Sequence, residues 1–237
     1  MTTISTFPPS SASTAPSSEE VAGRLEAVRA RIADAGGDPA QVRVVAVTKG
    51  FGPDAVRAAR GAGLRDLGEN YAAELLAKAE AVAREAVGAG RLVWHFLGAV
   101  QRNKVAHLAP VVGLWQSVAR EPEGARIARF APGAAVLAQV DTTGQPGRNG
   151  CPPGEAAALV ARLRDLGLDV RGLMTVAPSG REAAREAFRA VGALADDLGL
   201  EERSMGMTDD LEEAVAAGST MVRIGRALFG PRPAPVR

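Results

Sequence analysis

Lysine is scarce in this chain, and the scarcity draws attention to one position. Of the 28 basic residues in 237, only Lys49, Lys78 and Lys104 are lysines. Lys78 and Lys104 stand in polar or helical surroundings where any long cation would serve, whereas Lys49 follows residues 42–48, a β-branched run typical of a buried strand. A desolvated primary amine can lose its proton and attack an aldehyde, and a guanidinium cannot. Lys49 is therefore a candidate nucleophile, and a strand-end lysine that extends into water is the alternative.

Cysteine and histidine are also nearly absent. The single cysteine, Cys151, excludes an internal disulfide framework and suits a reducing compartment, so we expect a cytoplasmic protein. The two histidines, His95 and His107, have no cysteines at ligand spacing, which argues against a metal site. The chain also lacks the G-x-S-x-G elbow of serine hydrolases, so a Ser-His-Asp triad is not expected.

Long apolar runs and clusters of one charge are missing as well. No segment approaches the ~20 apolar residues that a spanning helix needs. The net charge is +1, and the arginines are scattered, so no basic stripe indicates a nucleic-acid partner. Residues 1–18 are rich in serine, threonine and proline and lack the apolar core of a signal sequence, so we expect a disordered tail there. Neither nucleic acid nor a membrane is expected as a partner.

The remaining residues, 19–232, show one alternation without a linker, which predicts a single domain. Apolar runs typical of strands lie at 42–49, 66–70, 92–98, 112–118, 135–141, 170–176, 203–207 and 221–224. Helical patterns include 19–35, 54–60, 72–86, 155–166, 181–198 and 211–217. Eight strands alternating with helices predict an α/β fold, a single (β/α)8 TIM barrel, and a doubly wound open sheet is the competing arrangement. Gly61 and Gly63 begin like a dinucleotide fingerprint, but they follow a helix instead of a strand and more simply end it.

The ends of the predicted strands are polar and rich in glycine, and a barrel places its active site at these ends. The loops after the seventh and eighth strands often bind phosphate in barrels, and Ser204, Gly206 and Gly225 lie there. Each glycine taken alone more simply permits a tight turn. Together with an aldehyde-competent Lys49, they suggest an aldehyde that carries a phosphate, pyridoxal 5′-phosphate (PLP).

Six sequence strings make a resemblance specific. They are VTK, LGEN, WHFLGAVQRNK, RGLM, SMGMTDDLEEAVAAGSTMVRIG and ALFG, and the match runs over about residues 19–230. In these strings the chain resembles the YggS/PROSC family of pyridoxal phosphate homeostasis proteins, which is related to the barrel domain of alanine racemase. The resemblance implies a barrel of the alanine racemase N-terminal-domain type that holds PLP as a Schiff base on Lys49.

The same resemblance implies roles for further residues. Ser204, Gly206 and the backbone of Gly225 and Arg226 would hold the phosphate, and Arg223 would face the pyridine nitrogen. Asn70 and His95 would line the ring, although either residue could instead be a helix cap or a satisfied polar group of the barrel. Met174 is expected as barrel core near the ring, and Glu69 as an arginine's partner or a cofactor contact. The implied cofactor-binding residues are thus Lys49, Asn70, His95, Ser204, Gly206, Met207, Arg223, Gly225 and Arg226.

Two departures from the family pattern alter these expectations. Arg226 stands where the family often has threonine or serine, so a hydroxyl group for the phosphate would be lost, and a guanidinium group would stand in its place. After Lys49 the chain reads Gly50-Phe51-Gly52, which is looser than the family's usual run, so a more mobile loop is expected there.

The resemblance implies a carrier of PLP rather than an enzyme. An arginine beside the pyridine nitrogen disfavours its protonation and makes the ring a weak electron sink. Racemisation also needs acid–base groups on both faces of the substrate, and the only tyrosine, Tyr71, begins a helix. Storage, buffering or delivery of PLP to apo-enzymes by a monomer is therefore expected. The alternatives are a PLP-dependent racemase or lyase of weak activity, and an aldolase in which Lys49 attacks a sugar phosphate.

Overall fold

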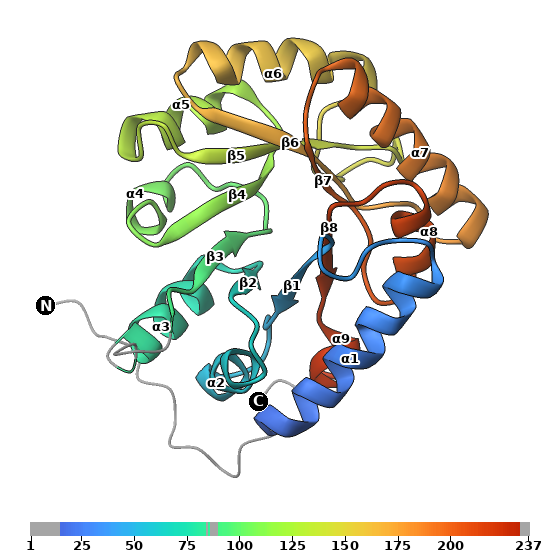
Figure 1. Ribbon diagram of the computed structural model, residues 1–237. Coiled ribbons are helices and arrows are strands. Elements are labelled where there is room, and N and C mark those ends of the chain that lie inside the picture. Colours follow the sequence, from blue (N-terminus) through green and yellow to red (C-terminus); the bar gives the residue numbers. More distant parts are fainter. Residues whose placement is uncertain (1–14, 84, 86–89, 233–237) are drawn as a thin grey trace, which may run out of the picture.

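The computed structural model describes residues 15–83, 85 and 90–232, in which eight parallel strands close into one barrel (Figure 1). The strands are β1 (Arg43–Val47), β2 (Asp66–Glu69), β3 (Val93–Phe96), β4 (Val112–Val118), β5 (Ala135–Val140), β6 (Asp169–Thr175), β7 (Glu202–Ser204) and β8 (Met221–Ile224). Their order around the barrel is their order in the chain, and β8 pairs with β1 over four residue pairs, beginning with Arg43 opposite Met221. This closure confirms the barrel and excludes the open sheet.

One helix precedes the first strand, a helix follows each strand, and together the helices form a ring outside the barrel, as Figure 1 shows. They are α1 (Ser18–Asp34), α2 (Pro53–Gly61), α3 (Ala72–Ala83), α4 (Val105–Leu108), α5 (Glu121–Phe130), α6 (Ala156–Asp165), α7 (Arg181–Asp197), α8 (Leu211–Ala216) and α9 (Arg226–Phe229), with a short 3-10 turn η1 (Pro153–Glu155) before α6. None of the described helices is long and apolar enough to cross a membrane.

The strand boundaries differ from the predicted ones by up to three residues, mostly because the polar strand ends leave the sheet early. β1 ends at Val47 instead of Lys49, and β7 ends at Ser204 instead of Met207. Gly206 has a φ of +90°, a left-handed conformation that a continuing strand does not adopt. The shorter strands therefore place Lys49 and Met207 in loops above the barrel. Gly63 also has a positive φ and follows the end of α2, as predicted for a helix-terminating glycine.

The predicted tail and the predicted third helix both reach outside the described residues. Residues 1–14 of the tail lie there, but Ser17 caps α1: its hydroxyl accepts from Glu20 N–H, and the Glu20 carboxylate accepts from Ser17 N–H. This capping box begins α1 at Ser18, one residue before the start of the predicted helix. The helix predicted at 72–86 is described to Ala83, and residues 84 and 86 lie outside the described ranges.

The apolar core is divided between two compartments. The larger one lies between the barrel wall and the outer helices, where Leu25 of α1 and Phe188 of α7 are buried. A small apolar cluster lies inside the barrel, with Val45, Leu114, Leu137, Met174 and Met221 among its members. Because so few apolar side chains point inward, polar residues occupy much of the remaining interior, and these residues connect to the candidate site.

Candidate functional site

A cavity of about 460 Å³ opens at the carboxyl ends of the strands, where barrels carry their active sites. Its walls come from the loops after β1, β2, β3, β6, β7 and β8, from the ends of β1, β6 and β8, and from the segment after α9. The lining residues are Val47, Lys49, Phe51, Asn70, Leu97, Met174, Val176, Met207, Thr208, Asp209, Arg223, Gly225, Arg226, Gly230, Pro231 and Arg232. Apolar side chains share the lining with polar and mostly cationic ones, and such a concave site suits a small molecule that has both a ring and an anionic group.

Lys49 is presented to this cavity by a tight turn. The Phe51 N–H donates to Thr48 C=O at 3.0 Å, so residues 48–51 form a β-turn with Lys49 at its second position. Gly50 follows with a φ of +78°, which suits the third position of a type II turn. Phe51 is buried against Phe229 of α9, with 5.6 Å between the ring centroids. The glycine-rich sequence after Lys49 thus forms a defined, hydrogen-bonded turn.

The surroundings of the Lys49 amine shift its protonation equilibrium toward the neutral form. Partial burial is the main cause that lowers the pKa of Lys49 below 10.5, and the charges of Arg232 and Arg223 lower it further. The Glu69 carboxylate acts in the opposite direction. Among the described residues that line the cavity, Lys49 is the only lysine. A neutral amine in a cavity is chemically equipped to add to an aldehyde.

Arg223 forms part of the cavity floor. Its Nη1 donates to the Ser204 carbonyl at 2.7 Å and to the Ser204 hydroxyl at 2.8 Å, and its Nη2 donates to the Thr175 carbonyl at 2.7 Å. Burial lowers the pKa of Arg223 to about 10, and no carboxylate pairs with it in the described part of the chain. A buried cation held by neutral acceptors is available to an electron-rich group of a ligand.

The loops after β7 and β8 meet at one side of the cavity. The Asp210 carboxylate accepts from Met207 N–H at 2.5 Å, and the Asp209 carboxylate accepts from the Arg226 guanidinium. Gly225 packs closely on β1, because a Cβ there would lie 3.2 Å from the Val47 carbonyl oxygen. This close approach favours glycine at position 225.

Six of the predicted cofactor-binding residues line the cavity together: Lys49, Asn70, Met207, Arg223, Gly225 and Arg226. Met174, expected near the ring, lines it too. His95, Ser204 and Gly206 are not in the lining, and the side chains of His95 and Ser204 are occupied with other partners.

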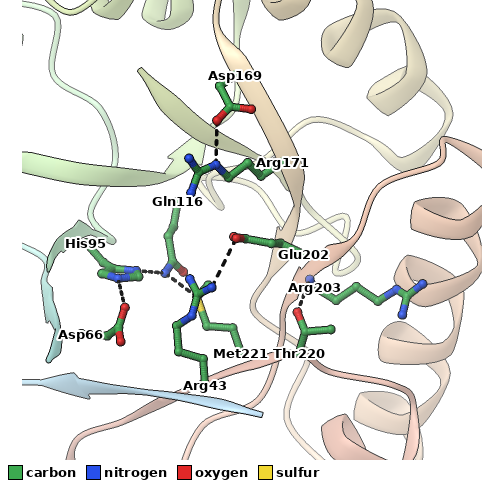
Figure 2. A network of polar contacts seen from close by, with 10 residues as sticks. All are labelled: Arg43, Asp66, His95, Gln116, Asp169, Arg171, Glu202, Arg203, Thr220 and Met221. Atoms are coloured by element: carbon green, nitrogen blue, oxygen red, sulfur yellow. Dashed lines mark hydrogen bonds and ion pairs between the residues drawn. The ribbon is translucent and has the colours of Figure 1, made fainter. Parts of the chain in front are cut away.

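His95 belongs to a network of polar contacts, in which Figure 2 shows it between Asp66 and Gln116. Its Nε2 lies 2.9 Å from Asp66 Oδ1, and its Nδ1 lies 2.6 Å from Gln116 Nε2. The Gln116 carbonyl accepts from the Ser204 hydroxyl at 2.6 Å, and that hydroxyl accepts in turn from Arg223. His95 is therefore the satisfied polar group of the barrel that the sequence left as an alternative. This series of hydrogen bonds links Arg223, which lines the cavity, to Asp66, the first residue of β2, at the opposite end of the barrel.

Two expectations about charged residues are wrong. Lys78 was expected in surroundings that suit any long cation, but it is only 3% exposed and forms an ion pair with Glu69 at 2.6 Å. Glu69 was expected to pair with an arginine or to contact the cofactor, and the arginine pairing is wrong, because Glu69 Oε1 pairs with Lys78 instead. The other carboxylate oxygen, Oε2, has no hydrogen-bond partner among the described residues. Periodicity predicts which face of α3 is buried and does not reveal a buried ion pair on that face.

The sequence reasoning also missed part of the lining. Arg232 follows the last helix and lies over the turn, where its Cδ would be 3.1 Å from a Cβ at Gly50. Thr208 and Asp209 stood in the recognised string SMGMTDD, a signal that could have identified them. No local pattern marks Arg232, because only the closure of the barrel brings this segment beside β1.

Comparisons with known proteins identify the family and the class of fold. Residues 23–233 match the family model described as the N-terminal domain of alanine racemase, which defines the class of barrel. A pyridoxal phosphate homeostasis protein of Pseudomonas aeruginosa is 40% identical over 225 residues, covering 90% of this chain and 96% of the relative. One of Deinococcus radiodurans is 39% identical over 213 residues, covering 86% of this chain and 97% of the relative. The chain belongs to the family of pyridoxal phosphate homeostasis proteins.

Solved structures show similar folds. PipY of Synechococcus elongatus, whose structure has PLP bound, superimposes with a TM-score of 0.76 at 31% identity, over 89% of this chain and all of PipY. Lysine decarboxylase of Selenomonas ruminantium, with a TM-score of 0.65 and 18% identity, matches over 90% of this chain and 61% of the enzyme's own chain. At that identity the likeness concerns the fold alone.

Proposed function

We propose that this protein binds PLP in the cavity, with Lys49 as its covalent attachment point, and stores or delivers the cofactor within PLP homeostasis. The observation that carries the proposal is the half-buried Lys49 amine, which faces a cavity that also contains Arg223, Arg226 and Arg232. An amine for an aldehyde and guanidinium groups for a phosphate occur together nowhere else among the described pockets.

The residues present fit the cofactor. Val47, Met174 and Val176 supply apolar surface for a ring, and Arg223 lies on the cavity floor without a carboxylate partner in the described residues. Thr208, Arg226 and Arg232 supply polar groups for a phosphate dianion. The names of the curated relatives and the PLP-bound structure of PipY support the same assignment.

The attachment is chemically balanced without a further reactant. The neutral Lys49 Nζ would add to the aldehyde carbon, and the carbonyl oxygen would leave as water with the two hydrogens of the amine. When bound, PLP supplies an electrophilic aldehyde and a ring that withdraws electrons. The chain's own contribution is a desolvated amine, cationic side chains for the anionic groups, and apolar walls that limit water.

A carrier is favoured over an enzyme by the side chains around Lys49. The titratable groups of the lining are Lys49, Asp209, Arg223, Arg226 and Arg232. Asp209 is paired with Arg226, and arginines are poor general bases. Tyr71, the one tyrosine, is 58% exposed and is not in the lining. A second group to move a proton at the Cα of a bound amino acid is therefore missing from the described lining.

Borohydride reduction tests the proposal. Reduction of the protein after incubation with PLP should attach a stable pyridoxyl group to Lys49, identified by peptide mapping. Lys49→Ala should abolish the labelling, whereas Lys104→Ala, at an exposed position, should leave it unchanged. Labelling that is absent from Lys49, or found at Lys78 or Lys104 alone, would refute the attachment.

A further inference from the structure

A buried ion cluster lies directly behind the turn that carries Lys49. Lys78 of α3 donates to Glu69 Oε1 at 2.6 Å and to Glu74 Oε2 at 2.9 Å, and its side chain is 4% exposed. Glu69 is fully buried at the end of β2, and Glu74 lies one helical turn before Lys78. The Thr48 hydroxyl also donates to Glu69 Oε1, at 2.5 Å. The cluster therefore connects the end of β1, the end of β2 and α3 at one point.

The cluster holds the backbone on both sides of Lys49. On the N-terminal side, Lys78 Nζ donates to the Thr48 carbonyl at 2.8 Å. On the C-terminal side, the Gly50 N–H donates to Glu74 Oε2 at 2.8 Å. The Thr48 carbonyl accepts one hydrogen bond from Lys78 Nζ and another from the Phe51 N–H, so both of its lone pairs are used. The peptide groups that flank Lys49 are thus fixed to α3 by side chains.

The chemistry of the cluster requires lysine. An ammonium has three donors that diverge from one atom, and here all three are used, toward Thr48, Glu69 and Glu74. A planar guanidinium fork directs its donors differently, which gives a reason for a lysine in a chain whose cations are nearly all arginine. Burying such a cluster costs desolvation energy, so the cluster is weak evidence for a gain in stability. We expect its role to be to fix the geometry of the backbone around Lys49.

We propose that Glu74 and Lys78 are positioning residues for Lys49: they hold the Thr48–Gly50 backbone so that the amine faces the cavity. This inference rests on the proposed function, because it assumes that Lys49 reacts with a bound aldehyde. The two residues contact the turn and not the cavity, and neither is among the lining residues. Their effect therefore falls on the covalent step and not on the pocket that receives the ring and the phosphate.

Two ligands separate these effects. PLP reports the reaction of Lys49, through the rate of borohydride-trapped labelling, whereas pyridoxine 5′-phosphate has an alcohol in place of the aldehyde and reports the pocket alone. Glu74→Ala should slow labelling of Lys49 about tenfold or more, the scale of one hydrogen bond to a charged group. The dissociation constant for pyridoxine 5′-phosphate should stay within about twofold. Glu74→Gln keeps an acceptor for Gly50 N–H and should restore most of the labelling rate.

The matched control is Glu80→Ala, the same substitution at an exposed position of the same helix, which should leave both readouts unchanged. Lys78→Met should slow labelling more than Glu74→Ala, with Lys104→Met as its control. If Lys78→Met does not fold, as judged by circular dichroism, the Glu74 variants carry the test. Equal weakening of both ligands by Glu74→Ala, or an unchanged labelling rate, would overturn the positioning role.

Failure of the proposed function gives a different result. If the unsubstituted protein does not label at Lys49 with PLP, the attachment itself is refuted. Reductive methylation of Lys49 by formaldehyde and cyanoborohydride needs no cofactor, so it still tests the positioning. The rate at Lys49 should fall in Glu74→Ala and not in Glu80→Ala.

Discussion

Burial and the nearby charges of Arg232 and Arg223 lower the pKa of Lys49, and the Glu69 carboxylate opposes them. The reactivity of Lys49 therefore depends on its neighbours as well as on its primary amine. Lys78, with the same side chain, is fully engaged in an ion cluster and has no donor left for a ligand. At the scale of single residues, the environment of each amine decides its role.

The lowered pKa of Lys49 predicts a pH dependence. Only the neutral amine reacts, and a folded-state pKa below 10.5 gives a larger neutral fraction at any pH below that value. The rate of reductive methylation at Lys49 should rise with pH and level off at a lower pH than for N-acetyl-lysinamide in the same tube. Peptide mapping by mass spectrometry measures the extent of methylation at Lys49 at each pH. Coincident curves for the two amines would contradict the lowered pKa.

The hydroxyl of Ser204 predicts an effect on stability. It donates to Gln116 and accepts from Arg223, and both partners are buried. Ser204→Ala should lower the free energy of unfolding by about 1–3 kcal/mol, because it leaves buried polar groups unpaired. Denaturant unfolding measures this change, with Ser179→Ala at an exposed position as the control. An unchanged stability with a large loss of preference for PLP over pyridoxal would instead favour a phosphate contact by Ser204.

At the scale of elements, barrel closure depends on strands that approach very closely. Gly172 of β6 pairs with Glu202 of β7, and a Cβ at position 172 would lie 1.8 Å from the Glu202 carbonyl oxygen. That oxygen belongs to the backbone of a three-residue strand, so no side-chain rotation relieves the clash. The contact between β6 and β7 therefore requires glycine.

Gly172→Ala should consequently destabilise the barrel by about 1–3 kcal/mol or more, the usual cost of overpacking. Thermal or urea unfolding measures the loss. Gly154→Ala is the control, because Gly154 is exposed and nothing lies within 4 Å of its added Cβ. Equal stability of the two variants would show that β7 shifts freely, contrary to the close packing of β6 on β7.

At the scale of the whole molecule, function depends on which groups the barrel gathers around one amine. Six loops and the last described segment contribute to the cavity, and the resulting lining is cationic with one paired carboxylate. Such a lining suits an anionic cofactor and offers little for proton transfer at carbon. The proposed carrier role belongs to this scale, since no single residue excludes catalysis.

The carrier role predicts slow exchange at carbon. With PLP bound, the protein should exchange the Cα hydrogen of L-alanine or L-serine with deuterated water far more slowly than the ~10 s⁻¹ typical of enzymes. Proton NMR with saturating amino acid measures the exchange. The Lys49→Ala variant sets the background rate. Exchange near enzymatic rates would instead favour a racemase or lyase.

Much of the fold and part of the site follow from local sequence. All eight strands were predicted to within three residues at each end, because short β-branched runs bounded by glycine or polar residues are local signals. Lys49, Asn70 and Arg223 were predicted from their places at strand ends and in recognised strings. Arg232 and the burial of Lys78 were not predicted, since both depend on segments that are distant in the chain.

The sequence by itself determined the alternation of strands and helices, the family and the candidate lysine, since these are properties of neighbouring residues. Only the tertiary structure decided that the sheet closes and that His95 and Ser204 turn into the barrel interior. It also decided that Glu74 and Lys78 reach back to the turn of Lys49. The placement of these four polar side chains is a competition among partners for a buried polar group, and the partner that binds depends on distances that only the closed barrel sets.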